Sequence, residues 1–124
     1  MDIESQRFAD TVVLSARGRV DHETSEQLKN ALLIQVDSCE ADGERLVIDL
    51  SEVEYISSVG LRALMMAAKR VQAQDAVMVV AKPTSVVREI LEISRFHLMI
   101  RMFDDVPAAL AALSPQAAEA YGAR

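Results

Sequence analysis

Two short and almost unbroken apolar runs, separated by a helical pattern, constrain most strongly what this chain can fold into. The runs span 46–50 (LVIDL) and 76–81 (AVMVVA), and each is typical of a strand buried on both faces of a sheet. Between them, from Ser58 to Gln74, apolar residues recur at helical spacing. The predicted inward face of this helix consists of Leu61, Leu64, Met65, Ala68 and Val71. A strand, a helix and a strand in this order predict parallel pairing with a right-handed crossover.

Similar patterns predict the elements that precede this unit. Alternating residues up to Val20 predict a β-hairpin with its turn at Ala9–Asp10. A helix is predicted from Thr24 to about Cys39, because Thr24 and Gln27 have the spacing of a capping box. The polar residues 51–55 predict a loop before the helix from Ser58.

Beyond the second apolar run, Pro83 is expected to end the strand, and Thr84 or Ser85 is predicted to cap a third helix. The apolar stripe of that helix is predicted to contain Val87, Ile90, Leu91 and Ile93. A third strand is predicted over 98–102, and a last helix is predicted to begin after Asp104 or Asp105.

These elements predict an α/β fold with a mixed, mostly parallel sheet, an N-terminal β-hairpin and about four helices. A length of 124 residues fits a single domain, which we place over residues 1–113. The small and polar residues from Ser114 onward predict a flexible tail over 114–124.

The net charge of −6 excludes several partner classes. A protein that binds nucleic acid regardless of sequence needs a basic face, and so does a protein that binds anionic lipids. The charge is also uneven, with a net −8 over residues 1–61 and a net +4 over residues 62–101. We therefore expect neither nucleic acid nor a membrane as a partner, and a cytoplasmic location, since no secretory signal is recognisable.

The chain offers little equipment for catalysis or metal binding. Cys39 is the only cysteine, and His22 and His97 lie far apart, so no metal site is predicted. No glycine-rich phosphate loop is present, and no cofactor is expected. Ser58 lacks the glycine that a hydrolase elbow needs two residues earlier, where Ile56 stands. We therefore predict no catalytic residues and no enzymatic activity.

The remaining feature is the pair Ser57–Ser58, which a polar segment delivers to the start of the helix. One interpretation is that Ser57 or Ser58 caps the helix by accepting a backbone N–H. The other is that one hydroxyl accepts a phosphoryl group, because a helix N-terminus accommodates phosphate. Both roles are open at this point.

Three segments carry a family resemblance in their order along the chain: residues 18–21 (GRVD), 46–51 (LVIDLS) and 55–61 (YISSVGL). They resemble the motif after the second strand, the central strand and the signature around the serine of the STAS family, in its anti-sigma factor antagonist branch. The likeness extends to about Leu113. Many members have Asp where this chain has Ser57, and a serine or alanine where it has Val59.

The resemblance implies a partner switch. The partner of the antagonist is an anti-sigma factor that is also an ATP-dependent serine kinase of the histidine-kinase-like type. The unphosphorylated antagonist binds this partner, which then releases the sigma factor. The motif places the phosphoacceptor at Ser58, with Ser57 as the second candidate. A separate serine phosphatase resets the switch.

Helical spacing places Ser58, Arg62, Met66 and Lys69 in one stripe, which we call the α-stripe. We expect this stripe to bind the kinase together with Asp21, Thr24, Ser57, Val59 and Gly60. The chain is expected to be a monomer or a weak homodimer. The alternative function is a STAS scaffold without phosphoregulation, such as a subunit of a lipid-transport or stress-signalling complex. A hydrolase is a third and weaker hypothesis.

Overall fold

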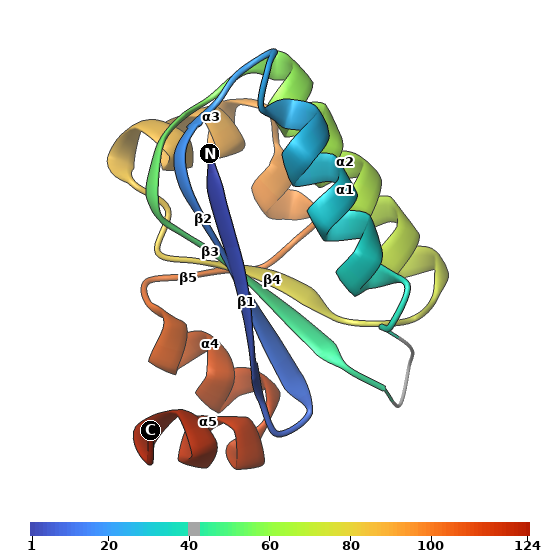
Figure 1. Ribbon diagram of the computed structural model, residues 1–124, viewed down its shortest axis with the longest axis vertical. Coiled ribbons are helices and arrows are strands. Elements are labelled where there is room, and N and C mark those ends of the chain that lie inside the picture. The colour runs from blue at the N-terminus through green and yellow to red at the C-terminus, as the bar shows by residue number, and fades with distance from the viewer. Residues whose placement is uncertain (40–42) are drawn as a thin grey trace.

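A five-stranded sheet forms the centre of the computed structural model, which describes residues 1–39 and 43–124 (Figure 1). The strand order is β1-β2-β3-β4-β5, in which β1 and β2 pair antiparallel and all other pairs are parallel. The strands are β1 (Asp2–Phe8), β2 (Thr11–Val20), β3 (Arg45–Ile56), β4 (Met78–Ala81) and β5 (Met102–Phe103). The predicted mixed, mostly parallel sheet with an N-terminal hairpin is confirmed.

Helices cover both faces of this sheet. They are α1 (Ser25–Val36), α2 (Ser58–Ala73), α3 (Ser85–Ile93), α4 (Val106–Leu113) and α5 (Pro115–Gly122), with a 3-10 turn η1 (Phe96–Leu98). Leu32, Leu64 and Leu91, from α1, α2 and α3, belong to the core on one face. Val106, Leu110 and Ala117 close a smaller core on the other face. Figure 1 shows α1 and α2 side by side, apart from α4 and α5.

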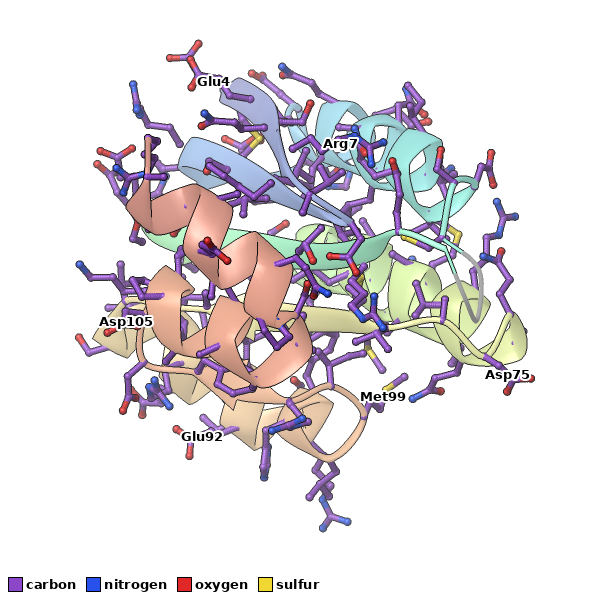
Figure 2. The ribbon with its side chains drawn as sticks, turned by 90° about the horizontal axis from the view of Figure 1, so that it is seen from below. Glu4, Arg7, Asp75, Glu92, Met99 and Asp105 are labelled. Carbon is purple, nitrogen blue, oxygen red and sulfur yellow. The ribbon has the colours of Figure 1, made fainter. Side chains whose placement is uncertain are left out.

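The ends of the helices point to different sides of the molecule. In Figure 2, Asp105, which caps α4, and Asp75, which follows α2, lie at opposite sides.

Among the described residues, no helix has both the length and the apolar character needed to cross a membrane.

Strand β3 is longer than the sequence predicted, and the prediction of a loop at 51–55 is wrong. Val53 and Ile56 are buried, and they pair with Gly18 and Val20 of β2. The register shifts twice along this pair, which allows the strand to continue although its residues do not alternate regularly. The start of α2 is therefore fixed to a strand of the sheet instead of following a free loop.

The segment after α3 also differs from the prediction. Arg95 adopts a left-handed backbone (φ 64°), which ends the helix, and the following residue Phe96 is fully buried. The strand predicted at 98–102 therefore begins only at Met102, behind η1. Ile93, predicted to face the core, is 75% exposed because α3 ends there.

The structure contains one helix more than the sequence predicted, because residues 115–122 of the expected flexible tail form α5. Ser114 caps this helix by accepting the N–H of Ala117 at 3.2 Å, and its hydroxyl donates to Asp10 Oδ1 at 2.6 Å. Tyr121 packs edge-on against Phe8, with 5.0 Å between the ring centroids. These partners lie more than a hundred residues away in sequence, so local composition could not reveal them.

Candidate functional site

The two serines meet different environments at the point where β3 ends and α2 begins. Ser57 is the N-cap: its backbone is extended, it is half-buried, and its Oγ accepts the N–H of Gly60 at 3.1 Å. Ser58 is the first residue of the helix and is exposed. Its hydroxyl forms no hydrogen bond with any residue that the structure describes. The open choice of cap is therefore resolved in favour of Ser57.

The start of α2 is pressed against the end of β2. The Ser57 N–H donates to the carbonyl of Val20 at 2.7 Å. A Cβ on Gly60 would overlap Cγ1 of Val20 and would lie 3.4 Å from its carbonyl oxygen. Only glycine allows this close approach, which explains the glycine two residues after Ser58.

The loop between β2 and α1 follows directly after this contact. Thr24 Oγ1 lies 2.8 Å from the carbonyl of Arg19 and accepts the N–H of Asp21 at 3.0 Å. Asp21 Oδ1 accepts the N–H groups of Thr24 at 3.1 Å and Glu23 at 3.0 Å. These bonds, with that from the Thr24 backbone first, lower the pKa of Asp21 below its usual value. Asp21 is thus a fixed negative charge one residue from Val20.

Thr24 does not have the role that its spacing to Gln27 suggested. It occupies the N-cap position of α1, but its backbone is helical and its side chain caps nothing. Its hydroxyl binds within the loop, and Gln27 Nε2 donates to the carbonyl of Met1 at 2.9 Å. The predicted capping box is therefore wrong, because Asp21 competes for the threonine side chain.

The predicted α-stripe lies on the accessible side of α2. Ser58, Arg62 and Lys69 are exposed and Met66 is half-buried. Arg62 and Met66 line two depressions, of about 230 Å³ and 480 Å³. Of the other predicted residues, Val59 lines the first depression, whereas Gly60 lies on the buried face of α2.

Several residues of this region were not predicted from the sequence. Ser25, Glu26 and Lys29 of α1 and Ala63 of α2 line the first depression, and the spacing of four residues between Ser25 and Lys29 on one helix face was a usable signal. Arg19 places its guanidinium 4.8 Å from the centroid of the Tyr55 ring. These two are register partners on β2 and β3, a pairing that the predicted loop at 51–55 concealed.

The chemical group that the start of α2 exposes is the Ser58 hydroxyl. Over the described residues, 1–39 and 43–124, no three His, Cys, Asp or Glu side chains gather to hold a metal ion. Burial raises the pKa of the Cys39 thiol. Cys39 follows the C-terminal end of α1, where its thiol donates to the carbonyl of Gln35, and it is not part of this site. A depression of about 650 Å³ beside α5, lined in part by Asp49 and Tyr121, contains none of the predicted site residues.

Known proteins resemble the chain over most of its length. BtrV of Bordetella bronchiseptica, named as a candidate anti-sigma factor antagonist, is 32% identical over 112 residues, covering 90% of this chain and 94% of BtrV. An anti-sigma factor antagonist from Mycobacterium paratuberculosis has a similar fold (TM-score 0.81, 23% identity, 90% of this chain and 92% of that one). So does phosphorylated SpoIIAA of Bacillus (TM-score 0.70, 14% identity, 91% and 100%).

The family follows from the sequence match and agrees with the fold. The family model of the STAS domain matches residues 2–109, which reach from β1 into α4. The match includes the Ser57–Ser58 junction and both loops that meet there. The chain belongs to the STAS domain family.

Proposed function

We propose that this chain is an anti-sigma factor antagonist that acts through a phosphorylation-dependent partner switch. The observation that carries the proposal is the exposed and unbonded hydroxyl of Ser58 at the N-terminus of α2. In its unphosphorylated form the chain binds an anti-sigma factor and releases the sigma factor. Its role is binding, and the chemistry of the switch belongs to its partners.

The hydrogen bonds favour Ser58 over Ser57 as the phosphoacceptor. The Ser57 Oγ holds the first turn of α2 through Gly60, so modifying it would remove the cap. The Ser58 hydroxyl is exposed, and using it breaks no hydrogen bond to a residue that the structure describes. In the reaction, Ser58 Oγ forms a bond to the γ-phosphorus of ATP, the bond to the β-phosphate oxygen breaks, and the hydroxyl proton passes to a base on the kinase.

Phosphorylation would change the charge of the interface more than its shape. It adds about −1.5 to −2 charges at Ser58, where the helix N-terminus tolerates an anion. Asp21 contributes a further fixed negative charge at the same edge of the sheet. An interface that covers Ser58 in its neutral form would have to bury this charge, at a cost of several kcal/mol. A micromolar complex is held by about 8 kcal/mol, so such a cost would dissociate it.

The proposed partners are those that the family resemblance implies. The kinase is an anti-sigma factor with a histidine-kinase-like ATP-binding fold, and a serine phosphatase restores the hydroxyl. The name of BtrV and the phosphorylated form of SpoIIAA support this assignment, since they describe an antagonist and a phosphorylated protein of the same fold. The predicted interface residues Asp21, Thr24, Arg62, Met66 and Lys69 would surround the switch.

The test compares Ser58→Ala and Ser58→Asp with the wild type in binding to the purified cognate anti-sigma factor. Ser58→Ala should bind with wild-type affinity and gain no phosphate from ATP, as measured by intact mass. Ser58→Asp should bind at least tenfold more weakly. Ser57→Ala is the matched control and should still gain one phosphate. Unchanged binding of Ser58→Asp, together with phosphate on Ser57 alone, would refute the proposed switch.

A further inference from the structure

An apolar groove runs along α2. Three residues of the α-stripe, Arg62, Met66 and Lys69, line it together with residues that the sequence did not predict. Its first part lies between α1 and α2 and is lined by Ser25, Glu26 and Lys29 of α1 and by Val59 and Ala63 of α2. Its second part continues along α2 past Met65 to Lys69. Arg62 and Met66 line both parts, so we treat them as one surface, the α2 groove.

The floor of the α2 groove is suited to an apolar side chain. Val59, Met65 and Met66 are half-buried and leave part of their surface open, while Ala63 is 6% exposed and provides a small base. Methionine side chains are flexible and polarizable, so they adapt to the shape of an apolar partner. An apolar floor inside a charged rim is the arrangement that protein–protein interfaces commonly have.

The rim of the α2 groove carries three cations, Lys29, Arg62 and Lys69, and one anion, Glu26. Arg62 and Lys69 are exposed and form no ion pair with any residue described in the structure. Lys29, across the groove, lies 3.6 Å from the exposed Glu26, a pair of little strength. At the far end, Arg70 pairs with Asp37 at 3.4 Å and connects α2 to the end of α1. Two cations therefore remain available to a partner on the α2 side.

We propose that the α2 groove binds a helical segment of the anti-sigma factor that carries an apolar side chain between two carboxylates. The inference rests on the proposed function and specifies the chemistry of its partner. Arg62 and Lys69 are seven residues apart, or about 10.5 Å along the helix axis. Carboxylates seven residues apart on a partner helix have the same separation, and the apolar side chain between them faces Met66.

The groove is coupled to the switch through Arg62. Ser58 and Arg62 are one helical turn apart on the same face, so a phosphate on Ser58 lies within reach of the guanidinium. An Arg62 paired to this phosphate is no longer free for a carboxylate of the partner. Phosphorylation thus adds repulsion and removes one of the two cations that hold the partner segment.

The experiment measures binding of unphosphorylated variants to the cognate anti-sigma factor at 0.1 M and 0.5 M salt. Lys69→Glu should lower the affinity at least tenfold at low salt, whereas the matched control Lys82→Glu, which changes an exposed lysine that does not line the groove, should stay within twofold. Met66→Glu should lose affinity equally, and Met66→Leu should keep it. If Lys69→Glu and Met66→Glu both bind like the wild type while circular dichroism shows folded protein, the groove proposal is wrong.

A second arm tests the groove without the anti-sigma factor. Its probes are two lactam-stabilised helical peptides, one with Glu, Leu and Glu at positions i, i+4 and i+7, the other with Lys in place of both Glu. The Glu peptide should shift the methyl NMR signals of Met65 and Met66 and leave that of the buried Met78 in place. Equal shifts with both peptides, or none with either at millimolar concentration, would overturn the proposed chemistry.

Comparing the groove variants with Ser58→Asp separates failure of the groove from failure of the switch. If Ser58→Asp loses binding while Lys69→Glu and Met66→Glu do not, the groove proposal fails alone. If Lys69→Glu loses binding and Ser58→Asp does not, the switch fails and the groove remains a binding surface. If the unmodified chain does not bind the anti-sigma factor, both proposals fail.

Discussion

Gly60 shows how a single residue can fix the geometry of the site. Its missing side chain lets the first turn of α2 rest directly on Val20, while the hydroxyl of Ser57 satisfies the Gly60 N–H. Ser58 is left as the exposed residue of the turn. Glycine ordinarily makes a helix less stable than alanine does. The presence of Gly60 is therefore explained by the close contact with Val20 and not by helix propensity.

Gly60→Ala should therefore destabilise the protein by about 1–3 kcal/mol, because the new methyl group overlaps Val20 Cγ1. The measurement is urea unfolding at pH 7. Gly122→Ala is the control, since nothing lies within 4 Å of its added Cβ, and it should not be destabilising.

The double variant Gly60→Ala, Val20→Ala identifies the cause. Removing the valine side chain should relieve the overlap, so the combined loss should be smaller than the sum of the two single losses. Strict additivity would show that the two residues do not clash.

Helix α5 shows how an element of modest propensity is stabilised by its docking contacts. It has eight residues, a proline at its start, and a single fully buried side chain, Ala117. Ser114 connects it to the β1–β2 turn through Asp10, which also pairs with Arg45 at 2.7 Å. The cap, the carboxylate and the arginine belong to three distant parts of the chain.

Ser114→Ala should lower the free energy of unfolding by about 1–2 kcal/mol, because it removes both the N-cap and a hydrogen bond to a carboxylate. Ser85→Ala is a matched control, since Ser85 is an exposed first-turn residue of α3 whose cap is Thr84. Equal stabilities of the two variants in urea unfolding would show that the Ser114 contacts contribute nothing.

Across the molecule as a whole, acidic and basic residues predominate in different parts of the chain and make different kinds of contact. The acidic residues predominate up to Leu61, and the basic residues predominate from Arg62 to Arg101. Two of the acids, Asp10 and Asp21, hold loops at opposite ends of β2 through hydrogen bonds. The cations on α2 that form no ion pair with described residues, Arg62 and Lys69, lie along the proposed groove.

The protein should lose stability in acid. The hydrogen bond from Ser114 lowers the pKa of Asp10, and the backbone N–H of Thr24 lowers that of Asp21, so folding favours both carboxylates in their charged form. This contribution is complete above the ordinary value of 3.8 and disappears as the pH falls through the lower pKa of the folded state. Thermal unfolding should give a level Tm from about pH 7 to about pH 5 and a falling Tm below about pH 4.

The double variant Asp10→Asn, Asp21→Asn should have a lower Tm at neutral pH and a smaller drop in acid. Asp75→Asn, which changes an exposed carboxylate after α2, is the control and should retain the wild-type drop. An undiminished acid drop in the double variant would show that other groups cause it.

Elements whose signals are local could be predicted from the sequence alone. The apolar runs at 46–50 and 76–81 and the helical period between them predicted the parallel strands and α2, and the turn at Ala9–Asp10 predicted the hairpin. These features need only the period of burial along one segment. They also placed Ser57 and Ser58 at the start of a helix and put Arg62, Met66 and Lys69 on one face.

Features that depend on distant partners became visible only in the folded protein. Ser57 and not Ser58 caps α2, because Val20 holds the Ser57 N–H. The second half of β3 exists because β2 pairs with it, and α5 exists because Asp10 and Phe8 bind it. The groove needs α1 and α2 to lie side by side. Such contacts gain their free energy only after the chain has folded, so no single segment carries their signal.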